Sequence, residues 1–358
     1  MKKYKICVYA ISKNEEGFVD RWYDSVKEAD KIIVLDTGSV DNTIKKLKAH
    51  DIEVYQEEIV PWRFDTARNK SLELVPKDTD ICVCIDLDEV IEPGWRDKLE
   101  NLWDDKTTRL KYNYNWLLDK NNKPQVNFYI EKIHSRNDYK WAHPVHEILE
   151  NINNNECVKT TDEITINHYP DKNKSRSSYL NLLELSVKED PTDDRNMHYL
   201  GREYMYNKRY EEAINTLIKH LSLEKATWKD ERSASMRFIS RCYRGLQRYD
   251  EAKIWLDKAI KETPYLREAY VEKAMLNYEL KEWIQVVENL QRALIIETHQ
   301  KTYINEIFAW NETIYDLLSI AYFNLGAKKL SLEYINKALK LAPDNERLIN
   351  NKNIISGL

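Results

Sequence analysis

The sequence has few glycines and cysteines, no long apolar run and no excess of positive charge, and each of these absences argues against a class of protein. Only 7 of the 358 residues are glycine, which argues against a glycine-rich loop for binding phosphate. The 5 cysteines are odd in number and lack the spacing of a disulfide scaffold, so reduced thiols are expected. No apolar run approaches the roughly 18 residues of a membrane-spanning helix. The net charge of -5 offers no basic surface for nucleic acid. We therefore expect a cytoplasmic protein with no membrane span and no nucleic-acid partner.

The chain changes character near residue 170. Before this point, apolar strands such as those expected at 5–11 and 81–85 alternate with helices, the first of them at 15–28. Alternation of this kind predicts βαβ units and a mainly parallel sheet. From about residue 195 onward, every periodic segment is helical. The sequence therefore predicts an α/β domain followed by an all-α domain.

The helical half carries a repeated pattern of small and aromatic residues. In a complete copy a small residue is followed by a tyrosine, then by one or two alanines and a closing proline. The copies are Gly201, Tyr204 and Ala213; Tyr243, Ala252, Ala259 and Pro264; Ala274 and Ala293; and Tyr322, Ala338 and Pro343. The pattern resembles tetratricopeptide repeats, in which small residues let paired helices approach closely. A generic helical bundle stays open as an alternative, because the first and third copies are imperfect.

Two carboxylates, Asp86 and Asp88, directly follow the apolar run at 81–85. A strand that ends in two acids delivers them at the carboxyl edge of a sheet, where open α/β sheets bind ligands. Carboxylates at such an edge can hold Mg²⁺ or Mn²⁺ against a diphosphate. Two acids in a loop are more often simply solvated, so this pair alone does not establish a metal site and needs the support of the neighbouring motifs.

Four short motifs follow successive elements in a characteristic order. They are Asn14-Glu15-Glu16, the segment from Asp36 to Thr43, Ala67-Arg68-Asn69, and Asp86-Leu87-Asp88. Together they resemble the family 2 glycosyltransferases with the GT-A fold, over residues 1 to about 170. The segments Trp141 to Glu147 and Asn167 to Tyr169 resemble the closing motifs of a subgroup in which helical repeats follow this domain. That subgroup includes enzymes that glycosylate peptides.

The resemblance implies a specific architecture. The expected fold class is an α/β GT-A domain with a Rossmann-like mixed sheet at 1–172, followed by an all-α, TPR-like helical repeat domain at 194–358. A linker helix is expected between them, at 173–193.

The resemblance also implies an inverting, metal-dependent hexosyl transfer from a nucleoside diphosphate sugar, most simply a UDP-sugar, with Mn²⁺ or Mg²⁺ as the cofactor. A peptide or protein acceptor is favoured, because stacked helix pairs form extended concave surfaces. The repeats could also supply a homodimer interface. Two alternatives stay open: a glycan or lipid-linked acceptor, and an inactive adaptor whose repeats do the binding. The sugar and the acceptor atom are not determined.

The resemblance assigns donor binding to residues at the ends of the strands. These are Ile11, Glu15, Asp36, Arg68, Asp86 and Leu87. Asp36 would accept the imide N–H of uracil, although it could equally stabilise its own turn. Glu15 could instead favour the positive end of its helix. Arg68 is expected in the first turn of a helix, where a cation opposes the helix dipole, so it needs a partner. Either the diphosphate or an ion pair with Asp65 or Asp36 would provide one.

Metal binding and catalysis are assigned to four residues. Asp88 would hold the metal, and His168 would complete its shell, with His143 and His146 as rivals for that place. Glu147 would be the base that deprotonates the acceptor, with His146 either orienting it or contacting phosphate. The alternative for Glu147 is that it only holds its loop.

Aromatic residues gather in the segment before these histidines. They are Tyr112, Tyr114, Trp116, Phe128, Tyr139 and Trp141. Sugars stack on aromatic faces, but packing within the fold is the commoner role of such side chains. Trp141 adjoins the His/Glu motif, so it is the one expected to be exposed.

Overall fold

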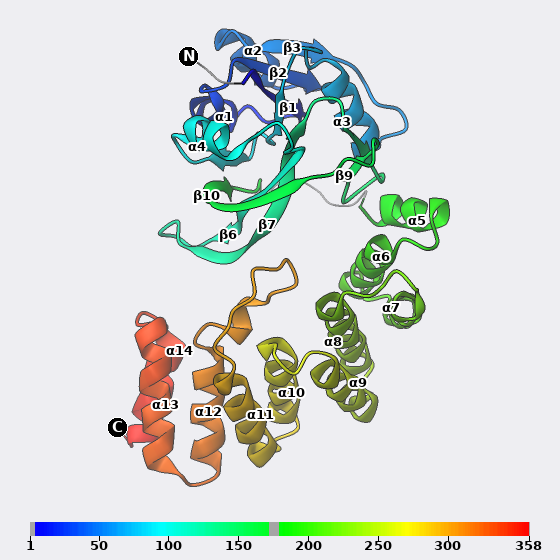
Figure 1. The fold of residues 1–358 in the computed structure, drawn as a ribbon. Helices are drawn as coiled ribbons and strands as arrows, with labels where there is room; N and C mark the ends of the chain where they lie inside the picture. Colours follow the sequence, from blue (N-terminus) through cyan, green and yellow to red (C-terminus); the bar gives the residue numbers. More distant parts are fainter. Residues whose placement is uncertain (1–3, 172–178, 358) are drawn as a thin grey trace. The chain divides into compact units, whose positions relative to one another are not determined.

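The computed structural model describes residues 4–171 and 179–357. The chain divides into two compact units (Figure 1). The first comprises Met1–Ser186 with Lys301–Tyr303, and the second comprises Val187–Gln300 with Ile304–Leu358. The start of the predicted linker helix lies outside the described residues, and helix α5 occupies Tyr179–Glu189. The domain boundaries at 172 and 193 stay predictions.

A mixed sheet forms the frame of the first unit. Among the described residues it has eight strands in the order β3-β2-β1-β4-β7-β6-β10-β5. These strands are β1 (Ile6–Ser12), β2 (Lys31–Asp36), β3 (Glu53–Gln56), β4 (Ile81–Cys84), β5 (Glu89–Ile91), β6 (Arg109–Leu118), β7 (Pro124–Ser135) and β10 (Val158–His168). Strand β1 runs parallel to both β2 and β4, whereas β7 is antiparallel to β4. The predicted α/β class with a mixed sheet is confirmed.

Helices and one small ribbon complete the first unit. The helices are α1 (Val19–Val26), α2 (Thr43–Ala49), α3 (Phe64–Glu73) and α4 (Trp95–Leu102). Strands β8 (Tyr139–Ala142) and β9 (Ile148–Asn151) pair antiparallel as a separate two-stranded sheet. Helix α1 is shorter than the predicted 15–28, because residues 16–18 form a turn before it; the Glu15 N–H at the start of this turn donates to the Thr43 hydroxyl at 2.6 Å.

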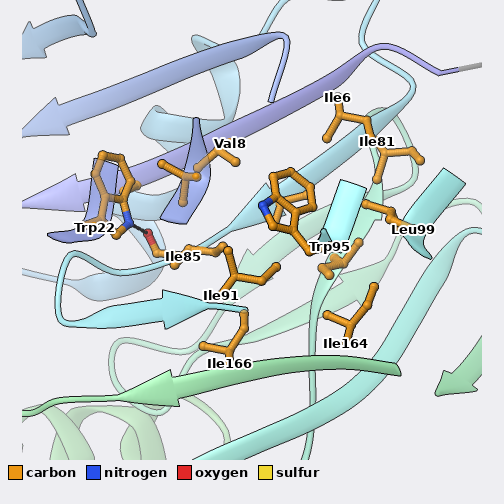
Figure 2. Close-up of a cluster of buried hydrophobic side chains, with 14 of the residues drawn as sticks. Ile6, Val8, Trp22, Ile81, Ile85, Ile91, Trp95, Leu99, Ile164 and Ile166 are labelled. Carbon is orange, nitrogen blue, oxygen red and sulfur yellow. Dashed lines mark hydrogen bonds between the residues drawn. The ribbon is translucent and has the colours of Figure 1, made fainter. Parts of the chain in front are cut away.

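The central strands are apolar on both faces because the sheet is covered on both. All four residues of β4 are buried, including Cys82 and Cys84. On one face, Trp22 of α1 and Trp95 of α4 pack against the strands (Figure 2). The Trp22 indole N–H also donates to the Ile85 carbonyl at 3.2 Å, directly before the Asp86 motif. The core therefore fixes the strand end that carries the two carboxylates. All five cysteines are free, as expected.

The second unit consists of helix pairs. In chain order its helices are α6 (Asp194–Tyr206), α7 (Tyr210–Ser222), α8 (Lys229–Gly245), α9 (Tyr249–Glu262), α10 (Arg267–Glu279), α11 (Trp283–Ile295), α12 (Thr313–Asn324), α13 (Lys328–Leu341) and α14 (Glu346–Ser356), with a short 3-10 turn at Ile307–Ala309. The predicted alanines Ala213, Ala252, Ala259, Ala274, Ala293 and Ala338 are all fully buried. Small residues are needed there, because a Cβ on Gly201 of α6 would lie only 2.5 Å from Leu217 Cγ of α7.

Across residues 4–171 and 179–357, no helix combines the length and the apolar character required to cross a membrane.

Candidate active site at the carboxyl edge of the sheet

An arginine held by two carboxylates lies at the centre of the predicted site. Arg68 projects from α3 and donates from its two terminal nitrogens to Asp86, to Oδ1 at 2.8 Å and to Oδ2 at 2.9 Å. Its Nε donates to Glu147 Oε1 at 2.5 Å. The structure thus joins three predicted residues that are far apart in sequence. Asp65, one of the alternative partners of Arg68, pairs with Arg63 instead.

Lys132 of β7, which the motifs do not predict, connects this arginine cluster to a second carboxylate. Its ammonium group donates to Asp86 Oδ2 at 2.9 Å and to Glu89 Oε1 at 3.0 Å. Glu89 is 2% exposed, and it also accepts from the Tyr114 hydroxyl at 2.7 Å and from the Asp86 N–H at 2.9 Å. Glu89 could have been suspected because it follows Asp88 directly. Lys132 carries no local signal, since its partners lie more than forty residues away in the sequence.

Burial and neighbouring charges set the protonation of this cluster. Burial acts to raise the pKa of Asp86, but Arg68 and Lys132 outweigh it and hold that pKa well below its usual value. Burial also opposes the charge on Arg68, yet Asp86 and Glu147 outweigh it and raise the guanidinium pKa. For Glu89, burial dominates and raises the pKa, although Lys132 acts in the opposite direction. Asp86 and Arg68 therefore form an ion pair in which each group favours the charged form of the other.

The two predicted metal ligands lie side by side. His168 Nε2, at the end of β10, is 3.5 Å from Asp88 Oδ2. His168 Nδ1–H donates to the Trp116 carbonyl at 3.1 Å, because a carbonyl can only accept. Nε2 therefore faces Asp88; burial acts to lower the pKa of His168, but the contact with Asp88 outweighs it and raises that pKa. A histidine that ligates a metal commonly has its other ring N–H fixed in this way. Ligand atoms about 2.1 Å from one octahedral cation lie about 3 Å apart, so this pair fits a divalent ion.

Asp36 is buried at the end of β2, and its own turn uses its carboxylate. Oδ1 accepts from the N–H groups of Gly38 and Ser39, at 3.1 and 2.8 Å. Oδ2 accepts from the hydroxyls of Ser12 and Ser39, at 2.8 and 2.5 Å. A carboxylate has about four acceptor positions, and all of them are occupied here. These contacts match the turn-stabilising alternative, and a uracil contact stays a prediction that requires the Ser39 hydroxyl to rotate.

The other residues predicted to bind the sugar donor lie around the ends of β1 and β4. Ile11 pairs with Leu35 across β1 and β2, and its side chain is half-buried. Glu15 is 7% exposed at the turn before α1. The Leu87 side chain is fully buried in the apolar core, so a contact of Leu87 with a ligand would have to come from its backbone.

The loop that carries Glu147 has unusual backbone geometry. His143 and His146 have positive φ values of 77° and 51°, which are uncommon for residues other than glycine. The Phe64 N–H of α3 donates to the Pro144 carbonyl at 3.0 Å and anchors the loop. The His146 ring lies 5.9 Å from the ring of Tyr179. The contact with Asp88 is made by His168, while these two histidines belong to the loop around Glu147.

The prediction that Trp141 is exposed is wrong. Its side chain is only 3% exposed, and its indole N–H donates to the Tyr9 hydroxyl at 2.9 Å. Asn69 fixes its backbone through two hydrogen bonds of 2.8 Å, which accounts for the asparagine beside Arg68 in the motif. Of the six aromatic residues in this group, Trp116 is the most exposed, at 40%, and it stacks on His168 with the ring centres 4.5 Å apart.

The first unit is an α/β domain with a cluster of charged side chains at the carboxyl edge of its sheet, and helical repeats follow it in the chain. Residues 7–148 match the profile of Glycosyl transferase family 2. Residues 238–265 and 312–345 match the Tetratricopeptide repeat. The chain therefore carries a family 2 glycosyltransferase domain followed by tetratricopeptide repeats, as the sequence predicts. The two matched repeats are the second and fourth copies, whose pattern is the more complete.

Solved structures that resemble the chain include repeat proteins. A thermophilic TPR protein, TTC0263 from Thermus thermophilus, is 19% identical, with a TM-score of 0.37 over 51% of this chain and 91% of that one. The pilF protein of Pseudomonas aeruginosa is 15% identical, with a TM-score of 0.38 over 48% of this chain and 70% of that one. No curated protein matched the chain.

Proposed function

We propose that the protein is an inverting, metal-dependent glycosyltransferase that moves a hexose from a UDP-sugar to a peptide or protein side chain. One observation carries the proposal. The Asp88–His168 pair and the Arg68–Asp86–Glu147 cluster lie at the same edge of a family 2 domain. The Asp88–His168 pair can bind a cation. In the cluster, Arg68 can exchange its contact with the Glu147 carboxylate for a contact with a phosphate group.

Asp88 and His168 would hold Mn²⁺ or Mg²⁺. Such an ion neutralises the charge that develops on the diphosphate as it leaves the sugar. The Nδ1–H bond from His168 to Trp116 keeps Nε2 available for this role, and the Asp88 side chain is 21% exposed. The two ligands therefore need little rearrangement when the ion arrives together with the donor.

Arg68 would bind the diphosphate. In the free protein Arg68 already has two carboxylate partners, Asp86 and Glu147, and only 6% of its side chain is exposed. Phosphate oxygens form the same charge-assisted, two-pronged contacts that carboxylates form. A donor placed at this edge can therefore compete with Glu147 for the Arg68 Nε–H while the bidentate contact to Asp86 persists.

Glu147 would act as the base that deprotonates the acceptor. Its Oε1 accepts from the Arg68 Nε–H in the free protein, so it lies beside the group proposed to bind the diphosphate. When the Arg68 Nε–H donates to a phosphate oxygen instead, Glu147 would be free to accept the proton of the acceptor. His146 would orient this side chain through the strained loop they share.

The nucleoside would lie over the ends of β1 and β2. Ile11, Glu15, Asp36 and the Leu87 backbone are the residues proposed to surround it. The acceptor would bind to the concave surface of the repeats, which stacked helix pairs form over a long stretch. The same surface, or its rim, could join two copies of the chain.

Calorimetric titration with UDP, in the presence and absence of Mn²⁺, tests the donor and the metal together. We expect metal-dependent binding that Asp88→Asn abolishes and that Asp105→Asn leaves unchanged, because Asp105 is exposed and remote from this edge. Transfer assays with UDP-sugars would then compare peptide and glycan acceptors. Binding that is equal with and without Mn²⁺ would remove the metal from the proposal. No binding of UDP under either condition would point to another nucleotide or to an inactive domain.

A further inference from the structure

A second group of potential metal ligands lies in the repeats, far in sequence from the residues of the proposed transferase site. Asp194 is in the first turn of α6, His220 is in the last turn of α7, and Glu231 is in the first turn of α8. One ligand atom from each side chain lies within 4.8 Å of the other two. Acids at helix starts have an ordinary role in favouring the helix dipole, so His220 is the residue that points to a ligand.

His220 is fully buried and held by a chain of hydrogen bonds. Its Nδ1 lies 2.9 Å from the Ser235 hydroxyl, which lies 2.7 Å from His198 Nδ1. A serine hydroxyl has one hydrogen, so it can donate to one ring while accepting from the other. When His220 Nδ1–H donates to Ser235, the serine can donate to His198, and both contacts are satisfied. This arrangement leaves the lone pair on His220 Nε2.

The Nε2 atom of His220 makes no hydrogen bond within the described part of the chain, although it is buried. Glu231 Oε1 lies 3.3 Å away, but the geometry does not suit an N–H···O bond. A buried polar atom without a partner costs about 1–3 kcal/mol, so such atoms are rare and call for an explanation. A lone pair that faces a carboxylate would be repelled by it unless a cation lies between them.

We propose that Asp194, His220 and Glu231 bind a structural Zn²⁺ ion. One imidazole nitrogen with two carboxylates is a ligand set that zinc accepts, and water can take the fourth position. Hard cations such as Mg²⁺ prefer oxygen alone, which the buried imidazole does not offer. Tetrahedral zinc places its ligands about 3.4 Å apart, so the side chains must close in by about 1 Å. Asp194 is only half-buried and has room to rotate. Ser235 is the partner that orients His220.

The ion would join the first repeat to the second. Helices α6 and α7 form one pair, and α8 begins the next, so a shared ligand set fixes the end of one pair against the start of the other. Because the ion binds only the folded chain, zinc should raise the melting temperature.

The test uses the full chain carrying Asp88→Asn, which removes the carboxylate from the proposed transferase metal site. After treatment with a chelator, the protein is titrated with Zn²⁺ by calorimetry and with Co²⁺ by visible absorption. We expect one ion per chain and the d–d bands of tetrahedral cobalt. Glu231→Gln and His220→Gln should each weaken binding by more than about 100-fold, and Ser235→Ala by about 10-fold to 100-fold. Glu224→Gln, at a nearby exposed glutamate, should have no effect.

Circular dichroism of each variant separates a lost ligand from a lost fold. The Asp88→Asn chain, which is unchanged at the proposed zinc ligands, tests zinc binding independently of those variants. If this folded chain binds no zinc and gives no tetrahedral cobalt spectrum, the proposal is wrong, and His220 and Glu231 form a buried pair around a proton instead. Equal zinc affinity in Glu231→Gln, Glu224→Gln and the parent would also overturn it. Neither result would affect UDP binding by the native chain.

Discussion

The two units each bury a cluster of opposite charges, and the clusters differ in their balance. In the repeats, Arg237 and Arg241 of α8 meet Glu272 of α10 and Glu306, with contacts from 2.5 to 3.2 Å. Two cations there face two carboxylates. At the sheet edge, the two cations Arg68 and Lys132 contact Asp86, Glu89 and Glu147, and a fourth carboxyl group, that of Asp88, faces His168.

The difference in balance indicates a difference in role. In the network around Glu272, the positive and negative charges are equal in number and pair with one another, so no ion from solution is needed to balance them. An excess of carboxyl groups is costly unless a further cation or proton is present. The raised pKa of Glu89 is one response to that excess, since burial and the neighbouring acids both disfavour its charge. The unbalanced cluster is therefore suited to receive a metal, whereas the balanced one stabilises the repeats.

The largest effect is expected at Glu147, the residue proposed as the base. Glu147→Gln keeps the size of the side chain and an oxygen that can accept from Arg68, but it removes the carboxylate. Turnover should fall by about 10²- to 10⁴-fold, the usual contribution of a positioned base. The dissociation constant of UDP should change little. Steady-state transfer assays and calorimetry measure the two quantities.

Glu58→Gln is the matched control, because Glu58 is exposed. It should leave both quantities unchanged. Equal losses of turnover and of UDP affinity in Glu147→Gln would indicate that Glu147 only holds its loop, and the contrast between the two clusters would then disappear.

The sequence predicts one of these clusters better than the other. Asp86, Arg68 and Glu147 each belong to a motif, so the family resemblance alone is enough to group them in one site. The Lys132 and Tyr114 contacts escape prediction, because they join segments that only the sheet topology brings together: β7 pairs antiparallel with β4, and β10 lies between β6 and β5. The burial of Trp141 escapes it for a related reason: its hydrogen-bond partner, Tyr9, lies at the other end of the domain in sequence.

The repeats are predictable because their contacts are local. Each helix packs on the next helix in the chain, so small residues at a regular spacing identify the interface. The buried ion network of α8 and α10 does not follow that spacing, and nothing in the alanine pattern indicates it. In both units, then, apolar packing can be read from the sequence, while buried charge pairs between distant segments cannot.

The next largest effect is expected in the stability of the repeats alone. Glu272→Gln removes one carboxylate from the balanced network and leaves Arg237, which is 1% exposed, with a weaker partner. Loss of one partner from a buried pair costs about 3–5 kcal/mol. Hydrogen exchange measured by mass spectrometry should show reduced protection in α8 and α10.

UDP binding by the same variant provides the comparison. It should be retained in Glu272→Gln, since this network lies in the other unit. Unchanged exchange in α8 and α10, accompanied by lost binding of an acceptor peptide, would show instead that the balanced cluster is a binding site.

The smallest effect is expected at Gly201, where helices α6 and α7 approach closely through uncharged residues. In Gly201→Ala the new methyl group would meet Leu217 Cγ at 2.5 Å, so α6 and α7 must separate or Leu217 must change rotamer. Overpacking of this kind costs about 1–3 kcal/mol, from which about 1 kcal/mol of improved helix propensity is regained. Gly17→Ala is the control, because a Cβ there meets nothing within 4 Å. Hydrogen exchange in α6 and α7 should rise in the first variant and stay constant in the second. No change in either would mean that the repeat tolerates larger residues at this interface, and that its small residues do not set the helix spacing.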